Sequence, residues 1–163
     1  MKFNYYGFKA IYVHEMNRFI RTVGQSILSP VISTSLYFVV FGSVIGSYIQ
    51  KIDGVSYGSY IVPGLLMLTL LTQSISNTSF GIFFPKFNGT INEILAAPIS
   101  TFEKVLAFVG AGATTTLLVG AVIFVKVSFF ASIIVKYKMF MIFLLVLVSF
   151  TFDLFGFLVG VVI

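Results

Sequence analysis

The sequence alternates long apolar runs with short polar segments. Four of the runs are long enough to cross the hydrocarbon core of a bilayer, which takes about 20 apolar residues in a helix. All of the charged residues except Asp153 lie outside these runs. The pattern predicts an all-α membrane protein with a single transmembrane domain over residues 1–163. Its four spans are expected at 27–48, 60–84, 105–125 and 139–163.

The segment that precedes the first span, residues 1–22, has an apolar and a basic side when it is drawn as a helix. This is typical of a helix that lies in the membrane interface, with its basic side toward lipid phosphates. Arg18 and Arg21 belong to the basic side, whereas Glu15 falls within the apolar arc. We expect an interfacial helix in which Glu15 either pairs with Arg18, one turn on, or contacts a neighbouring subunit.

Polar side chains interrupt two of the apolar runs. Gln73 and Asn77 lie four residues apart in the second run, and Asp153 lies within the fourth. Inside a membrane such groups need hydrogen-bond partners or water. Gln73 and Asn77 either bond between helices or line a polar route for a substrate. For Asp153 we expect a structural role, hydrogen-bonded to the second span, and a functional role is the alternative.

Small residues recur every fourth position in three of the runs. This spacing allows two helices to approach closely in a membrane. In the first run a lipid-facing position is the alternative. The residues are Gly42 and Gly46 in the first run, Gly112, Thr116 and Gly120 in the third, and Gly156 and Gly160 in the fourth.

The polar segment between the second and third runs, residues 89–100, reads GTINEILAAPIS. Thr90 and Glu93 have the spacing of a capping box, in which each side chain bonds the other residue's backbone N–H. Ser100 and Glu103 repeat that spacing at the start of the third run. The segment therefore predicts a short helix with Ile91, Ile94 and Leu95 on one face, ended by Pro98 before the next helix begins.

The composition agrees with a membrane protein and excludes several kinds of site. The chain is 58% hydrophobic and 9% charged, with no Cys and a single His. It therefore has no disulfide framework, and we expect no metal site and no catalytic residue. The net charge of +5 comes from scattered residues, which we interpret as membrane anchors, so nucleic acid is not expected as a partner. No Walker A pattern occurs, so the chain cannot hydrolyse ATP itself.

Two stretches resemble a known family. PGLL at 63–66 and FFPKFNGTINEILAAPISTFEK at 83–104 are similar to the permease subunit of type-2 ABC exporters, a likeness that runs from about Glu15 to the end of the sequence. The resemblance implies a six-helix permease fold in which 89–100 is a cytoplasmic coupling helix docked on an ATPase subunit. The residues assigned to docking are Gly89, Thr90, Ile91, Glu93, Ile94, Leu95, Pro98 and Ser100.

The resemblance also implies a function. It describes a permease subunit of an ATP-driven exporter that moves a glycan, a lipid-linked saccharide or a drug-like substrate out of the cell. Its partners would be an ATPase subunit, which binds ATP and Mg, a second permease copy and membrane lipid. With four of six spans, the chain is expected to be an N-terminal fragment that does not transport alone. The alternatives are a secondary transporter or channel, and a non-transporting helical scaffold.

The distribution of basic residues predicts the orientation in the membrane. Lys2, Lys9, Arg18 and Arg21 precede the first span, and the positive-inside rule places them in the cytoplasm. We therefore expect a multi-pass protein of the bacterial inner (plasma) membrane with a cytoplasmic N-terminus. The lysines at 126, 136 and 138 oppose this assignment, because they would lie outside.

Overall fold

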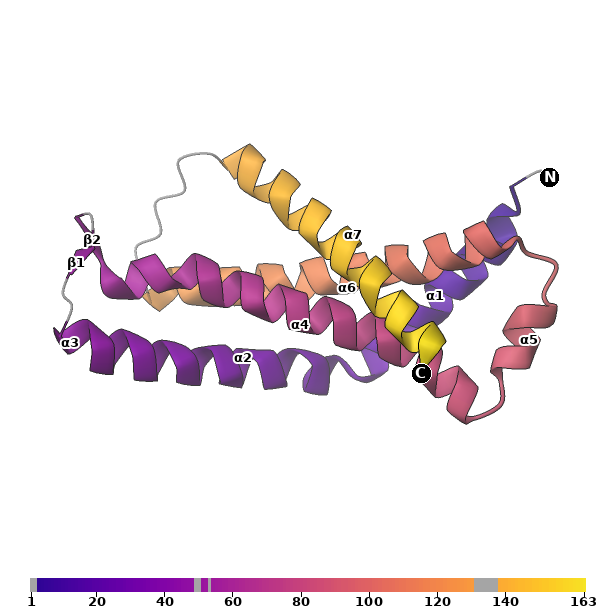
Figure 1. Cartoon of the computed structure of the whole chain (residues 1–163), viewed down its shortest axis with the longest axis horizontal. Helices are drawn as coiled ribbons and strands as arrows, with labels where there is room; N and C mark the ends of the chain where they lie inside the picture. Colours follow the sequence, from indigo (N-terminus) through magenta and orange to yellow (C-terminus); the bar gives the residue numbers. More distant parts are fainter. Residues whose placement is uncertain (1–2, 49–50, 53, 131–137) are drawn as a thin grey trace.

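The computed structural model describes residues 3–48, 51–52, 54–130 and 138–163, and these are helical apart from one small hairpin. Figure 1 shows the long helices roughly along one axis, with the hairpin at one end and the short helix α5 at the other, near the N-terminus. The elements are α1 (Tyr5–Arg21), α2 (Val23–Val39), the π-helix η1 (Val40–Ile45), α3 (Gly46–Tyr48), β1 (Lys51–Ile52), β2 (Val55–Ser56), α4 (Tyr57–Phe87), α5 (Ile91–Ala96), α6 (Thr101–Phe130) and α7 (Lys138–Val162).

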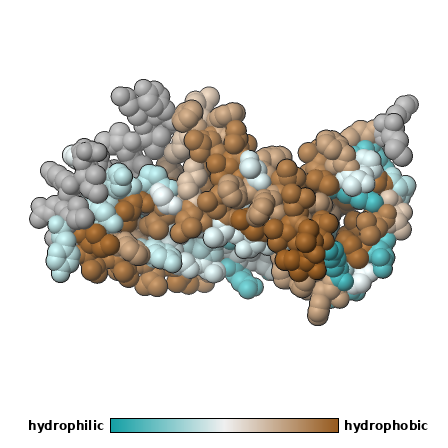
Figure 2. Space-filling view, viewed as in Figure 1, coloured by the Kyte–Doolittle hydropathy of each residue, from teal (hydrophilic) through white to brown (hydrophobic). Residues whose placement is uncertain are grey.

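Four helical stretches are long and apolar enough to cross a membrane. They agree with the four predicted runs in number and order, and they confirm the all-α membrane fold. Figure 2 shows apolar residues over the middle of the molecule and the most hydrophilic residues at the end that carries α5. The stretches are Val23–Ile45, Ser59–Phe87, Thr101–Lys126 and Met139–Val162.

The first span differs from its prediction at both ends. It begins at Val23, because the helix is interrupted at Thr22, whose φ of −106° and ψ of 12° are not helical. Pro30, expected near the start of the helix, lies inside α2. The α-helix then gives way to the π-helical turn η1, which the apolar pattern did not predict. The predicted start of the span, residue 27, lies four residues after the observed start at Val23.

The second span does not end at Phe84 and Pro85. Helix α4 continues through Pro85 to Phe87, and the turn that follows places Gly89 at φ +77°. Backbone N–H groups of Asn88 and Gly89 donate to the carbonyls of Phe84 (3.0 Å) and Lys86 (3.2 Å). A glycine in the left-handed region is a common end for a helix. Gly89 therefore ends α4. Pro85 lacks a backbone N–H, but it does not end the helix.

Helix α4 is the centre of the bundle and contacts α2, α6 and α7. A Cβ on Gly156 would lie 2.9 Å from Cα of Ile75, and one on Gly160 would lie 2.7 Å from the Ser79 carbonyl oxygen. The predicted glycine face of the fourth span is thus confirmed as the contact between α7 and α4. In the first span, a Cβ on Gly42 would meet no atom closer than the ring of Phe38, 3.9 Å away on the preceding turn.

Helix α6 ends later than the third span was predicted to end. It continues to Phe130, five residues beyond the predicted end at residue 125. Residues 131–137 lie outside the described residues. The small residues of the third span form a packing face, as expected, and the structure shows that the partner is α4: Thr116 is completely buried, and a Cβ on Gly120 would lie 2.6 Å from Cδ2 of Leu70.

Candidate functional site

Helix α5 forms, but its start differs from the prediction. Thr90 has helical angles (φ −73°, ψ −8°) and makes no side-chain cap, so the Thr90–Glu93 capping box was a wrong prediction. Its hydroxyl donates instead to the Pro85 carbonyl, at 3.4 Å. A capping residue needs extended angles, and the turn at Gly89 leaves Thr90 without them. Glu93 is exposed at the surface.

The end of α5 follows the prediction. Ala97 is extended (φ −60°, ψ 137°), as expected for the residue before Pro98. The ammonium of Lys104, on α6, donates to the Leu95 carbonyl at 3.0 Å and satisfies one of the free carbonyls in the last turn of α5. The short helix is thus attached to α4 at its start and to α6 at its end.

The second predicted capping box is confirmed at the start of α6. The Glu103 N–H donates to Ser100 Oγ (3.3 Å), and the Ser100 N–H donates to Glu103 Oε2 (2.9 Å). The other carboxylate oxygen, Oε1, accepts the backbone N–H of Asn4 at 2.7 Å. Glu103 is buried by this arrangement. One carboxylate therefore caps α6 and holds the start of the chain.

Asn4 joins α1 to the same place, a role that sequence reasoning missed. Its Oδ1 accepts the Gly7 N–H at 3.1 Å and caps α1, while its Nδ2 donates to the Pro98 carbonyl at 3.3 Å. A Cβ on Gly7 would lie 2.6 Å from Cγ1 of Ile99, so the first turn of α1 packs directly on this loop. We call Asn4, Gly7, 97–100 and Glu103 the α1–α5 junction. An Asn three residues before Gly7 was the only local signal for it.

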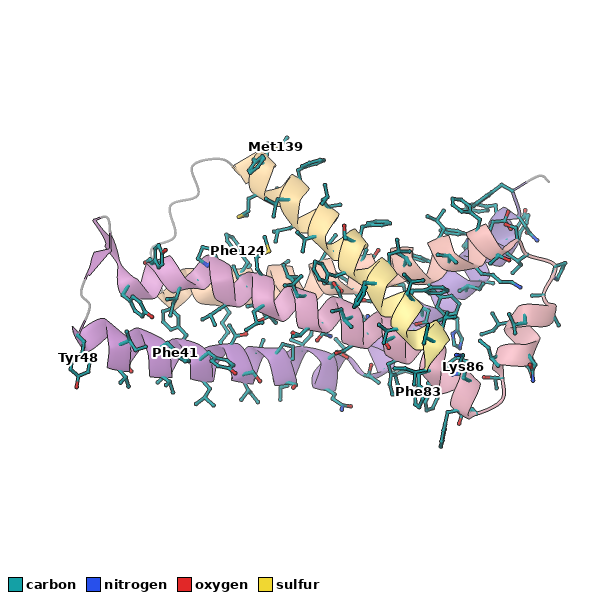
Figure 3. The ribbon with its side chains drawn as sticks, in the orientation of Figure 1. Phe41, Tyr48, Phe83, Lys86, Phe124 and Met139 are labelled. Carbon is teal, nitrogen blue, oxygen red and sulfur yellow. The ribbon has the colours of Figure 1, made fainter. Side chains whose placement is uncertain are left out.

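The apolar surface at this end is larger than the predicted docking face. Leu95 is 63% exposed, whereas Ile91 and Ile94 are half-buried. Phe87 and Phe102, which flank α5 on either side, are 76% and 71% exposed. Figure 3 shows Phe83 and Lys86 at the same end of α4. The exposed apolar residues around α5 are therefore Leu95 together with two aromatic side chains that the sequence pattern did not indicate.

The basic side of α1 was predicted to face lipid phosphates. The structure shows that only part of it can do so. Helix α1 packs against α6, and Glu15 is buried. The Arg18 guanidinium lies 2.7 Å from Glu15, which confirms the predicted i,i+3 pair. Its Nη2 also donates to the backbone carbonyl (3.1 Å) and the Oδ1 (3.3 Å) of Asn77. Arg18 therefore turns into the bundle to pair a buried carboxylate, while Arg21 is exposed.

The absence of a side chain at Gly81 makes room for this ion pair. A Cβ there would lie 2.9 Å from Glu15 Oε2 and 3.1 Å from Arg18 Nη2. Asn77 continues the network, since its Nδ2 donates to Thr115 Oγ1 on α6 at 2.5 Å. The ion pair thereby links α1, α4 and α6.

Asp153 is completely buried between α7, α4 and α6. The Thr78 hydroxyl donates to its Oδ1 at 2.6 Å, and the Ser149 hydroxyl donates to its Oδ2 at 3.2 Å. The bond to α4 is the contact expected for a structural Asp153. Gln73, by contrast, makes no side-chain hydrogen bond within the described part of the chain. That Gln73, Asn77 or Asp153 lines a substrate route stays a prediction.

Comparisons with known proteins identify the family of the chain. The family model described as ABC-2 type transporter matches residues 6–163. The chain is 38% identical over 153 residues to the inner membrane transport permease YadH of Escherichia coli K12, an alignment that covers 94% of this chain and 60% of the relative. The YadH permeases of Escherichia coli O157:H7 and Shigella flexneri match equally well.

The chain spans about 60% of the length of these curated relatives. No solved structure matches it. The family model extends over the four apolar helices and over residues 63–66 and 83–104, the two stretches that carried the sequence resemblance. The chain therefore belongs to the ABC-2 type transporter family.

Proposed function

We propose that this chain is a permease subunit of an ATP-driven exporter in the bacterial inner membrane, and that α5 docks on a separate ATPase subunit. The observation that carries the proposal is the attachment of α5. It is held to α4 and α6, with Leu95 turned outward and exposed aromatic residues on both sides. In this proposal ATP and Mg bind to the partner, and the chain itself performs no chemistry.

A displacement of α5 would reach three helices through direct contacts. Lys104 links the end of α5 to α6, and Glu103 links the start of α6 to Asn4 of α1. From α1, the Glu15–Arg18 pair reaches Asn77 in the middle of α4. Packed interiors transmit such displacements because they deform little. ATP-driven movement of the partner would thereby shift the balance between two arrangements of the spans.

The homologous relatives are named as transport permeases, which supports transport over a purely structural role. A secondary transporter would favour paired charges within the spans. Here the carboxylate of Asp153 is bonded by the hydroxyls of Thr78 and Ser149. We therefore favour the ATP-driven function, with outward movement of a glycan, a lipid-linked saccharide or a drug-like molecule.

A second permease copy is part of the proposal. In the most apolar 18-residue stretch of the first span, only 6% of the residues are buried within the protein. An apolar helix with so little protein contact is suited to lipid on one side and a partner on the other. The exposed residues of this face include Leu28, Ile32 and Leu36.

The docking proposal is tested by a charge on α5. Leu95→Glu would place an unpaired carboxylate in the interface with the ATPase, so recovery of the ATPase with the purified permease should fall by about tenfold or more. Ala96→Glu is the matched control, because Ala96 is exposed on the same helix but points about 100° away from Leu95 around the helix axis. It should leave recovery unchanged. If α5 instead lies on the lipid surface, Leu95→Glu recovers as much ATPase as the unaltered protein, and the docking assignment is overturned.

A further inference from the structure

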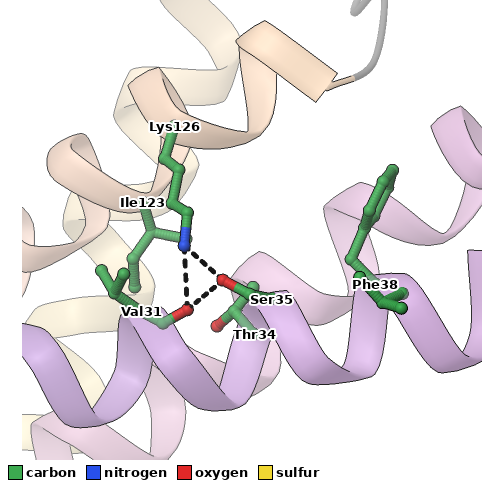
Figure 4. Close-up of a pocket in the computed structure, with 7 residues that line it drawn as sticks. Val31, Thr34, Ser35, Phe38, Ile123 and Lys126 are labelled. Atoms are coloured by element: carbon green, nitrogen blue, oxygen red, sulfur yellow. Dashed lines mark hydrogen bonds between the residues drawn. The ribbon is translucent and has the colours of Figure 1, made fainter.

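Lys126 occupies an unexpected position. It is the last residue of the candidate span Thr101–Lys126 and was expected to mark the outer end of that span. Its side chain turns back toward α2, where the ammonium donates to the Val31 carbonyl at 3.2 Å and to the Ser35 hydroxyl (Figure 4). Long basic side chains near the end of a span ordinarily extend toward the interface. Lys126 extends the opposite way.

The ammonium lies well inside the membrane-crossing part of the bundle. Val31 is in the candidate span Val23–Ile45. At a rise of about 1.5 Å per residue, its carbonyl is about 12 Å from one end of that span and about 21 Å from the other. A lysine at such a depth is costly without a counter-charge and marks a functional site by default.

No carboxylate of the described residues neutralises Lys126. Glu15 pairs with Arg18, and Asp153 accepts from Thr78 and Ser149. Glu93 and Glu103 belong to the opposite end of α6, around α5. An ammonium has three N–H donors, and only two partners contact it in the part of the chain that the structure describes. One donor and a full positive charge are left for a ligand.

The surroundings of the ammonium are mostly apolar. Lys126 lies in a pocket between α2 and α6 whose walls come from Val31, Thr34, Phe38, Val39 and Ile123, with the Ser35 hydroxyl beside the charge. Figure 4 shows the lysine reaching across to α2 between Val31 and Ser35, with Phe38 further along the same helix. One cation set into an apolar groove is complementary to an amphiphile with an anionic head and a hydrocarbon chain.

We propose that this pocket, the Lys126 site, binds the phosphate head group of an anionic lipid-like amphiphile, whose hydrocarbon chain lies along Phe38, Val39 and Ile123. A head group at this depth lies inside the hydrocarbon core, about 12 Å from the nearer end of the span. In this respect the inference rests on the proposed export function, because only a molecule in passage would place its phosphate there. The third N–H of Lys126 donates to the phosphate, and Ser35 lies beside it.

The site is tested by lipid binding to the purified protein in uncharged detergent, without any ATPase. The probe is fluorescent phosphatidic acid, and the reference is phosphatidylcholine with the same label and chains. Lys126→Gln should weaken phosphatidic acid binding by about tenfold or more, since it removes the charge-assisted bond. Lys126→Arg keeps the charge and should stay within about threefold. Neither change should alter phosphatidylcholine binding.

Two controls separate this site from general attraction of anions. Lys86→Gln removes another lysine that donates to a helix carbonyl, that of Val161, at the other end of the bundle. It should leave phosphatidic acid binding unchanged. Inorganic phosphate should compete poorly, because it cannot use the apolar wall. Equal losses in Lys86→Gln and Lys126→Gln, or full competition by inorganic phosphate, would overturn the lipid assignment.

A second measurement locates the bound lipid. The 163 residues contain no Trp, so Phe38→Trp introduces a reporter into the wall of the pocket. Phosphatidic acid with brominated chains should quench this reporter, and Lys126→Gln should abolish the quenching. Undiminished quenching in Lys126→Gln would show that Lys126 only joins α2 to α6. Because no ATPase is present, these results are independent of the Leu95→Glu test of docking.

Discussion

Gly112 shows how little space the middle of the bundle leaves for one extra carbon. A Cβ there would lie 2.3 Å from the Thr78 hydroxyl oxygen and 2.8 Å from Asp153 Oδ1. Neither atom can move aside cheaply, because the two are hydrogen-bonded to each other at 2.6 Å and both are buried. Any side chain at Gly112 must break that bond or push α6 away from α4 and α7.

We therefore expect Gly112→Ala to destabilise the protein by about 1–3 kcal/mol, the usual cost of overpacking. Gly110→Ala is the matched control in the same helix, since nothing lies within 4 Å of a Cβ at that position. It should be neutral or stabilising by up to about 1 kcal/mol, because alanine favours helix over glycine. Unfolding of both variants in detergent checks the difference. Equal stabilities would contradict the close packing at Gly112.

The polar side chains of the spans show what sequence can say at this scale. Because a buried polar group in a membrane is costly without a partner, we predicted hydrogen-bond partners for Asp153 and Asn77. In the structure these partners are Thr78 and Thr115. The same reasoning could not select those partners, because α4 offers many hydroxyls at similar spacing. It also placed Arg18 toward lipid, since a helical wheel does not show that Gly81 of another helix leaves room for the guanidinium.

At the scale of elements, the two predicted capping boxes have the same spacing and different outcomes. Ser100 follows the extended residue Ala97 and the rigid Pro98, and its box with Glu103 forms. Thr90 follows Gly89, whose left-handed angle belongs to the end of α4, and its box does not form. A capping motif specifies side-chain chemistry, whereas the backbone angles depend on the preceding turn. Reading Gly89 as a helix terminator would have corrected the prediction.

The two glutamates of these motifs therefore differ in what their loss should do. Glu103→Ala leaves the N–H groups of Asn4 and Ser100 without their acceptor, a cost of about 1–3 kcal/mol. Amide hydrogen exchange in the first turn of α1 should become about tenfold faster or more, because the junction opens locally. Glu93→Ala is the control, since Glu93 is exposed, and should leave exchange in α1 unchanged. Unchanged exchange in Glu103→Ala would show that Glu103 does not hold α1.

For the whole molecule, apolar run length predicted the number of spans, and local motifs predicted α5. The arrangement of these elements depends on contacts between distant residues. Asn4 and Glu103 are 99 positions apart, and Arg18 and Asn77 are 59 apart. No local pattern brings such residues together, so the joining of α1 to α5 and α6 was not predictable from periodicity. The same is true of the inward turn of Lys126.

That inward turn bears on the orientation in the membrane. Lys126 opposed a cytoplasmic N-terminus when it was counted as a basic residue outside the membrane. Its ammonium lies against Val31 within the span, so it no longer counts with the flanking charges of the positive-inside rule. Lysines 136 and 138 still oppose the assignment. The lysines at 9, 86 and 104, together with Arg21, favour the end that carries α1 and α5 as the cytoplasmic one.

We therefore expect α5 and the hairpin to lie on opposite sides of the membrane, with α5 inside. Asn88 directly follows the end of α4, beside α5, and Tyr48 ends α3 at the other end of the bundle (Figure 3). Both are exposed and can be changed singly to Cys in a sequence without Cys. On intact cells an impermeant thiol reagent should label Tyr48→Cys but not Asn88→Cys. Both should react once the cells are permeabilised, which shows that each thiol is accessible. Labelling of Asn88→Cys alone on intact cells would reverse the orientation, place α5 outside the cell and remove the basis for its docking on a cytoplasmic ATPase.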